Sequence, residues 1–165
     1  MTPDAPTPIC AAGAILAVVD HVRSYGQLGV ETGGFLYMAR GSEIASGVAL
    51  TGIKGIVRRP GLFKISGEAI DELFSWAENG DLFVPIQWHS HSIEAFLSCV
   101  DRNSGFSVDG FISVVLPFFK DPSADVSKWS WNIFQKGDWS PIEAPTVVDD
   151  AAQVVVFDED GVRGA

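Results

Sequence analysis

Cysteine and histidine are both scarce in this sequence. Of its 165 residues only two are cysteines, Cys10 and Cys99, and they lie far apart along the chain. Two distant cysteines are a poor basis for a disulfide framework, so we expect a reducing, cytoplasmic environment. There are only three histidines, which makes any close pair of them informative.

Basic residues are also few. Eleven Lys and Arg residues are outnumbered by 21 Asp and Glu residues, which gives a formal net charge of −10. Because neutralising phosphate groups requires a basic face, this balance argues against a nucleic-acid partner and against an anionic membrane surface. Several of the acidic residues are concentrated in residues 149–160, which we expect to be solvated.

Long apolar runs are missing as well. No run reaches the roughly 20 residues that a membrane-spanning helix needs, and the start "MTPDAPTP" lacks the basic residues of a secretory signal. Apolar residues nevertheless make up 47% of the chain and charged residues 19%, which is typical of a globular protein. A length of 165 residues fits one domain with its own core.

The apolar pattern predicts both helices and strands. Helical spacing indicates a helix at about residues 10–25 and a second one after Ser66, a candidate N-cap. A short third helix is expected at residues 98–105. Strands are predicted at residues 30–39, 43–53, 55–59, 63–66, 82–91, 109–119 and 128–139. This order predicts a mixed α/β domain in which helices flank a central sheet.

Composition also divides the chain into three parts. The proline-rich residues 1–9 are expected to be flexible, and residues 10–145 to form the compact domain. Residues 146–165 are expected to be either an acidic tail or a late strand, because "AQVVVFDEDG" combines an apolar run with acidic residues.

The stretch "WHSHSIEAFLSCVD", residues 88–101, contains two histidines one residue apart. On a strand, residues two apart point to the same face, so His89 and His91 are expected to project together while Trp88 and Ser90 face the other side. An H-x-H sequence alone is weak support for a metal site. The remaining histidine, His21, is taken to be an ordinary core or surface residue.

A serine and an aspartate follow this histidine pair. Ser98 and Asp101 are three residues apart, so one helical turn places them on the same side. A strand that leads into such a turn brings Asp101 to the two imidazoles. Two imidazoles, one carboxylate and an open fourth position match a catalytic zinc site. Cys99 is expected to point away from this site.

A glutamate upstream adds a candidate base. Glu31 precedes two glycines in "VETGGFLY", at the start of a predicted strand. A carboxylate beside an activated water can accept its proton and pass it to a leaving amine. Gly33 and Gly34 permit the close approach of another backbone. The alternative is that Glu31 is simply an exposed charge at the end of a strand.

Together, "ETGG", "HSH" and "S-x-x-D" resemble the JAMM motif of JAB/MPN-domain metalloproteases, and the resemblance covers roughly residues 10–140. It implies a single JAB/MPN-like domain with a central, mostly antiparallel sheet. It also implies a zinc-dependent isopeptidase that cleaves after the C-terminus of a ubiquitin-like protein. In that family pattern, His89, His91 and Asp101 bind Zn²⁺, Glu31 is the general base and acid, and Ser98 donates a hydrogen bond to the oxyanion.

The sequence departs from the family pattern in two places. Six residues separate the second histidine from Ser98 where seven are usual, and Ser92 replaces the usual proline. Only residues 102–108 lie between Asp101 and the next predicted strand, where members that select among ubiquitin chain linkages have a longer insertion. The short connection is typical of a compact, prokaryote-like member.

The resemblance leaves three functions open. The first is a deconjugating or precursor-processing isopeptidase that works with activating and conjugating enzymes, for instance in an anti-phage system. The second is a JAB hydrolase that processes a sulfur-carrier protein, and the third is a non-catalytic MPN scaffold. For the first, we expect the modifier's extended tail to pass along the glycine-rich segment 46–57, with Gly52 and Gly55 leaving room for it.

Overall fold

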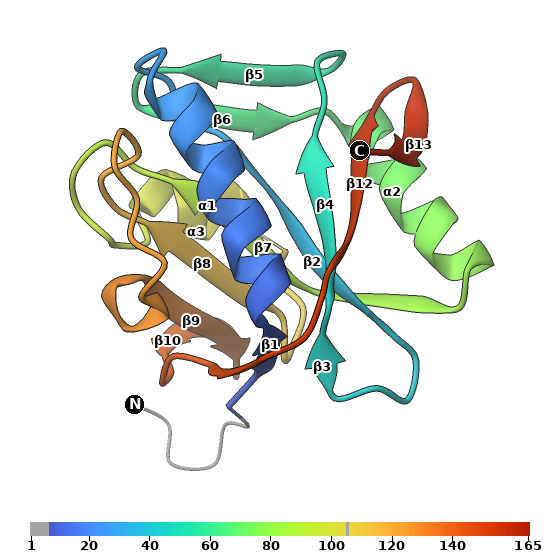
Figure 1. Cartoon of the computed structure of the whole chain (residues 1–165). Helices are drawn as coiled ribbons and strands as arrows, with labels where there is room; N and C mark the ends of the chain where they lie inside the picture. The colour runs from blue at the N-terminus through green and yellow to red at the C-terminus, as the bar shows by residue number, and fades with distance from the viewer. Residues whose placement is uncertain (1–6, 105) are drawn as a thin grey trace.

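An eight-stranded sheet runs through the centre of the protein (Figure 1), in the order β10-β9-β8-β7-β2-β4-β12-β13. The computed structural model describes residues 7–104 and 106–165. The sheet is mixed but mostly antiparallel, since only the β7–β8 and β4–β12 pairs are parallel. This α+β architecture confirms the predicted fold class. The strands are β2 (Gly33–Ala39), β4 (Gly47–Thr51), β7 (Leu82–Ser90), β8 (Ile112–Leu116), β9 (Ser130–Gln135), β10 (Asp138–Pro141), β12 (Gln153–Asp158) and β13 (Gly161–Gly164).

Smaller elements surround the sheet. The three α-helices are α1 (Ala12–Gly26), α2 (Gly67–Asn79) and α3 (Cys99–Ser104), and a 3₁₀ turn, η1, covers Val126–Lys128. The antiparallel hairpin of β5 (Ile56–Arg59) and β6 (Leu62–Ile65) stands apart from the sheet. A small parallel sheet combines β11 (Thr146–Val148), β1 (Ile9–Ala11) and β3 (Ile44–Ala45).

Two cores form on opposite faces of the sheet because strand side chains alternate. Leu36 of β2 and Trp88 of β7 belong to the core beneath α1, where Val18 is fully buried. Phe35 belongs to the core on the other face, with Leu73 of α2. Figure 1 shows α1 lying across the sheet and α2 standing beside β12 and β13. Each face of the sheet is thus covered by one long helix.

The helix α2 begins where the sequence predicts it. The Ser66 hydroxyl accepts a hydrogen bond from the Ala69 amide at 3.2 Å, so Ser66 is the N-cap. The first helix, α1, has no side-chain cap and starts directly from β1 at Ala11. The expected flexible segment 1–9 falls mostly on residues 1–6, which lie outside the described residues, as does residue 105 at the end of the third predicted helix.

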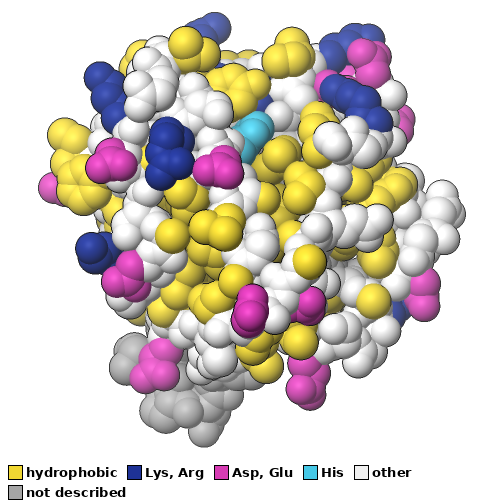
Figure 2. Space-filling view, viewed as in Figure 1, with side chains coloured by type: hydrophobic (Ala, Val, Ile, Leu, Met, Phe, Trp, Pro, Cys, Tyr) yellow, Lys and Arg dark blue, Asp and Glu magenta, His cyan; other side chains and the backbone are white. Residues whose placement is uncertain are grey.

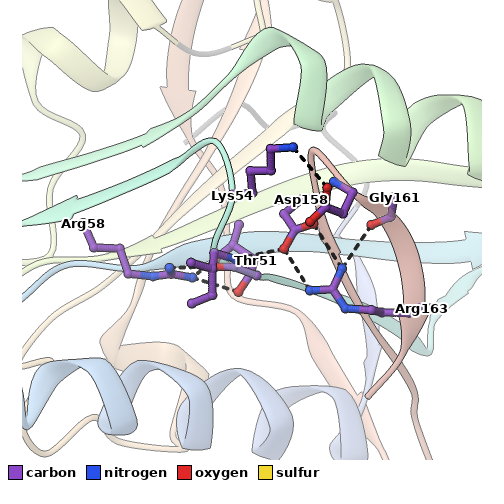
Figure 3. A network of polar contacts seen from close by, with 9 residues as sticks. Thr51, Lys54, Arg58, Asp158, Gly161 and Arg163 are labelled. Atoms are coloured by element: carbon purple, nitrogen blue, oxygen red, sulfur yellow. Dashed lines mark hydrogen bonds and ion pairs between the residues drawn. The ribbon is translucent and has the colours of Figure 1, made fainter.

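The last twenty residues contribute strands to the structure. The strand β12 pairs in parallel with β4 and antiparallel with β13, so the chain returns into the central sheet after residue 145. The buried Asp158 carboxylate accepts a hydrogen bond from the Ile53 amide. It also accepts hydrogen bonds from the Arg163 guanidinium, as Figure 3 shows. These bonds fasten the turn after β4 to the C-terminal hairpin.

The surface in Figure 2 shows acidic, basic and apolar side chains interspersed on the face that carries α1. Both cysteines are free, with Cys10 buried and Cys99 exposed, and burial raises the pKa of the Cys10 thiol to about 12. In the described ranges, no helix has both the length and the apolar character needed to cross a membrane.

Candidate metal centre

The end of β7 presents two imidazoles on one face. His89 and His91 are both buried, and their Nε2 atoms lie 3.2 Å apart. Trp88 and Ser90, which alternate with them, point into the side of the sheet covered by α1. The two-residue periodicity of a strand therefore places the histidines together, as the sequence predicted.

The third donor comes from the short helix α3. Asp101 lies with Oδ1 3.2 Å from His89 Nε2 and with Oδ2 3.4 Å from His91 Nε2. Its position is fixed locally, because the Ser98 amide donates to Asp101 Oδ2 at 2.8 Å and the Asp101 amide donates to Ser98 Oγ at 3.1 Å. This reciprocal pair is a capping box, which starts α3 and aims the carboxylate at the histidines.

The spacing of these donors fits a zinc ion. The three ligand atoms lie within 4.8 Å of one another. Tetrahedral bonds of about 2.0–2.1 Å place neighbouring ligand atoms roughly 3.3–3.4 Å apart, close to the 3.2–3.4 Å found between the donors of His89, His91 and Asp101. Two nitrogens, one carboxylate oxygen and a side open to a cavity form a candidate site for a divalent metal ion with a free position.

The second ring nitrogen of His91 is also engaged. His91 Nδ1 lies 3.2 Å from the carbonyl oxygen of Glu94, which can only accept a hydrogen bond. The proton of a neutral His91 ring is therefore on Nδ1, and the lone pair of Nε2 faces the other donors. Such an outer contact orients the ring and makes it a better ligand.

Charge inside the group favours an ionised aspartate. Burial opposes ionisation of Asp101, but hydrogen bonds from His89 and His91 hold the pKa of its carboxyl far below the usual range. Burial likewise tends to lower the pKa of His91, yet the Asp101 carboxylate raises it on balance. The anionic carboxylate attracts positive charge to this position, whether a proton or a metal ion.

Glu31 stands on the same side of the sheet as the metal donors. It lies just before β2, where Gly33 pairs with His89, and only 8% of its surface is exposed. Burial raises the pKa of its carboxyl, although the neighbouring His91 and His89 oppose this shift. The alternative, that Glu31 is simply an exposed charge at the end of a strand, is therefore wrong. A buried carboxyl with a raised pKa beside a cavity is suited to transferring protons.

The glycines after Glu31 allow the strands to approach closely. A Cβ added to Gly33 would lie 2.6 Å from the Trp88 carbonyl oxygen, and one added to Gly34 would collide with the Ala49 carbonyl oxygen. Any larger residue at either position would push β2 away from β7 or β4. The glycine pair thus permits the close approach of other backbones, as the sequence suggested, and this helps to keep Glu31 next to the histidines.

A cavity of about 460 Å³ opens over these residues and is lined by Glu31, His91, Ser98 and Asp101. Its rim is mostly apolar and comes from the β5–β6 hairpin, the loop after β7 and α3. These rim side chains are Leu62, Phe63, Ile93, Phe96 and Val100. Phe96 also makes an edge contact with the His91 ring, with 5.2 Å between the ring centroids.

The glycine-rich segment 46–57 does not form a wall of this cavity. Among the described residues that line it, none comes from that segment. A Cβ on Gly52 would meet the carboxylate of Asp158, and one on Gly55 would meet Glu159. The expectation of a channel along these glycines is therefore wrong, because the C-terminal hairpin already fills the space beside them. The β5–β6 turn takes that position at the cavity.

No protein-family model matches the chain, and a search among curated proteins found no match. Solved structures do resemble it. Protein DSY2949 from Desulfitobacterium hafniense is similar with a TM-score of 0.65 and 14% identity, covering 87% of this chain and 94% of that one. AF2198, a JAB1/MPN domain protein from Archaeoglobus fulgidus, is similar with a TM-score of 0.51 and 13% identity, covering 86% and 98%.

At these identities the similarity concerns the fold, and the fold is that of a JAB/MPN domain. This chain combines the fold with a His-His-Asp candidate metal site. The structure brings the five residues singled out in the sequence, His89, His91, Asp101, Glu31 and Ser98, to one place. Cys99 lies outside the group and is exposed.

Three residues behind the site were missed. Thr32, Ser90 and Arg58 form hydrogen bonds on the opposite face of the sheet, directly under the metal donors and Glu31. The sequence offered one signal for these residues, the alternation of side chains along a strand, which placed Ser90 on that face. Nothing in the local sequence around Arg58 indicates that its guanidinium reaches Thr32, because this contact depends on how the β5–β6 hairpin folds back.

Proposed function

We propose that this protein is a zinc-dependent isopeptidase or peptidase that cleaves after the C-terminus of a ubiquitin-like modifier. One observation carries the proposal: a metal-donor triangle with tetrahedral spacing shares its cavity with the buried carboxyl of Glu31. The JAB/MPN fold, and the resemblance of the sequence to the JAMM motif, support the same reaction class. The fold alone does not specify a substrate.

His89, His91 and Asp101 would hold the zinc ion. When bound, zinc supplies a Lewis acid that polarises a carbonyl and lowers the pKa of a water molecule. Glu31 accepts a proton from the attacking water and delivers it to the departing amine nitrogen. The water oxygen bonds to the carbonyl carbon while the carbon–nitrogen bond breaks, so the products are a carboxylate and a free amine.

Ser98 is suited to stabilise the oxyanion that develops on the carbonyl. Its Oγ already accepts a hydrogen bond from the Asp101 amide, which leaves the hydroxyl proton free to be donated. Since Ser98 lines the cavity beside the metal donors, that proton is available to a substrate oxygen there. A single oxyanion donor is worth about 10²–10³ in rate.

The extended tail of the modifier enters between the β5–β6 turn and the loop after β7. Gly61, Leu62 and Phe63 from the hairpin lie across the cavity from Ile93 and Phe96. An extended peptide binds well in such a place, because strand edges offer main-chain hydrogen bonds and apolar side chains cover the peptide. The modifier's name and its target are left open by this proposal.

The test is metal content together with cleavage. Freshly purified protein is expected to hold about one zinc ion per chain and to cleave a modifier fusion in a chelator-sensitive manner. Asp101→Asn is expected to lose both properties, while Asp20→Asn, a matched change on the exposed face of α1, keeps them. Protein that holds no zinc, and that gains no activity on adding it, would refute the enzyme proposal and favour a scaffold.

A further inference from the structure

A polar network lies directly behind the metal site, on the face of the sheet that α1 covers. Its centre is Arg58 of β5, which is half-buried. Arg58 Nε donates to Thr32 Oγ1 at 3.0 Å, and Nη2 donates to Thr51 Oγ1 at 2.8 Å. The guanidinium also donates to the Thr51 and Gly52 carbonyl oxygens. Figure 3 shows this side chain reaching from β5 to Thr51.

The same guanidinium stacks on α1. Its carbon lies 3.9 Å from the centroid of the Tyr25 ring, a cation–π contact. Each nitrogen of the Arg58 guanidinium therefore has a hydrogen-bond partner. The groups that it contacts lie at the end of β4, in the segment before β2 and in α1. A planar fork with fixed donor directions holds such a junction more firmly than a flexible ammonium group would.

Thr32 connects this network to the metal site. Its amide donates to Ser90 Oγ at 3.0 Å, and the Ser90 amide donates to the Thr32 carbonyl oxygen at 2.9 Å. Ser90 lies between the two histidine donors. The neighbouring Glu31 amide donates to the carbonyl oxygen of Arg59 at 3.3 Å. The backbone that carries Glu31 is thus bonded to the histidine strand on one side and to β5 on the other.

His21 completes the network from α1. Its Nε2 lies 3.0 Å from Thr32 Oγ1, and burial lowers its pKa to about 3, with the charge of Arg58 adding to the effect. The ring is therefore neutral at neutral pH. Thr32 Oγ1 accepts the Arg58 Nε proton and lies beside His21 Nε2, so it joins the guanidinium to the neutral imidazole.

We infer that Arg58 and Thr32 are positioning residues that set where Glu31 stands relative to the metal donors. This rests on the proposed function, in which Glu31 transfers the proton. Neither residue lines the cavity, so both act through the backbone of residues 31–32. Because a misplacement of about 1 Å can reduce a rate by roughly 10²-fold, a loosened network lowers turnover without removing metal or substrate contacts.

The first test uses two substitutions of Thr32, which is fully buried. Thr32→Val keeps the shape and removes the hydroxyl, whereas Thr32→Ser keeps the hydroxyl and removes a methyl group. If the hydrogen bonds position Glu31, Thr32→Val lowers kcat on the order of 10- to 100-fold with KM and zinc content little changed. Thr32→Ser then stays close to wild type.

The opposite order would overturn the inference. If Thr32→Val is as active as wild type and Thr32→Ser is impaired, Thr32 acts only through packing. A loss of kcat that follows a loss of thermal stability in both variants would have the same meaning.

The second test removes the guanidinium fork. Arg58→Lys keeps the positive charge but loses the planar fork that spans Thr32, Thr51 and Gly52, and it is expected to lower kcat by a similar factor. Arg40→Lys is the matched control, because Arg40 forms an exposed ion pair with Asp81 away from the metal site. Equal kcat for Arg58→Lys and the wild type would contradict the assignment.

A third measurement needs no activity. In metal-free protein, amide hydrogen exchange at Glu31 and Thr32 is expected to speed up at least about tenfold in Arg58→Lys, while the amides of β8 and β9 keep their protection. Unchanged exchange at both amides would overturn the inference. If the wild type is inactive on every fusion tested, the proposed function fails, and the exchange result still decides whether Arg58 holds this segment.

Discussion

The two halves of the candidate metal site are supported differently. Glu31, His89 and His91 stand on or beside the adjacent central strands β2 and β7, with hydrogen bonds reaching this segment from β5 and α1. Asp101 stands on a six-residue helix whose first turn depends on the Ser98 capping box. Glu31 and the two histidines are thus carried by the sheet, whereas Asp101, the third candidate ligand, is carried by a short local helix.

This difference indicates where the site can adjust. Strand residues in a central sheet open only with much of the fold, while a short, partly exposed helix opens on its own. Cys99 and Val100 of α3 are exposed, in contrast to the buried histidines. A bound metal ion is therefore expected to stabilise α3 far more than it stabilises β7.

The largest effects are expected when one candidate metal ligand is removed from each half of the site. His89→Ala and Asp101→Ala are both expected to lose stable zinc binding and all activity, since two remaining donors hold the ion poorly. Their local effects should differ. In Asp101→Ala the Arg102 amide, which donates to the Ser98 carbonyl oxygen, exchanges much faster with solvent, while β7 stays protected. Equal exchange in both variants would show that the halves are not independent.

The next largest effect is expected from Glu31, the proposed proton carrier. Glu31→Gln keeps the shape of the side chain and removes its ability to accept a proton, so kcat should fall by about 10²–10⁴. Zinc content and KM should remain near the wild-type values, because the metal donors are untouched. Measuring zinc and steady-state kinetics on the same sample checks this. Near wild-type turnover would remove Glu31 from the mechanism.

A pair of substitutions at Ser98 separates catalysis from capping. Ser98→Ala removes both the oxyanion donor and the cap, whereas a glycine N-cap loses only a few tenths of a kcal/mol. Both variants should therefore lose about 10²–10³ in kcat, but Ser98→Ala alone should destabilise α3 by about 1 kcal/mol. If Ser98→Gly keeps its activity, Ser98 serves the helix and not the reaction.

The effect that is smallest at neutral pH concerns the network behind the sheet. An unfolded histidine has a pKa near 6.5, whereas burial lowers that of His21 to about 3. Between these values the unfolded state binds more protons, so the free energy of unfolding should fall as the pH drops from 6.5 towards 3. The slope from one such group is at most about 1.4 kcal/mol per pH unit, and above pH 6.5 it vanishes.

Denaturant unfolding of the metal-free wild type and of His21→Gln at several pH values measures this slope. The difference between the two proteins isolates His21, because every other ionisable group is common to both. Parallel stability curves from pH 7 to pH 4 would show that His21 is not held neutral by its surroundings.

Sequence alone located the candidate metal donors because their spacing is local. Residues two apart share a face of a strand, and residues three apart share a side of a helical turn, so "HSH" and "S-x-x-D" specify two small geometries without any knowledge of the fold. The sequence also predicted that another backbone comes close at Gly33 and Gly34, and the structure confirms this. The helix after Ser66 follows from similarly local rules.

Only the tertiary structure decided how these pieces meet. The burial of Glu31 beside the histidines, the reach of Arg58 to Thr32, the cavity rim from the β5–β6 turn and the entry of β12 into the sheet all join segments far apart in the chain. Strand pairing and loop closure depend on which apolar faces can be buried together. Backbone periodicity fixes the direction of a side chain, but packing of the whole chain fixes what that side chain meets.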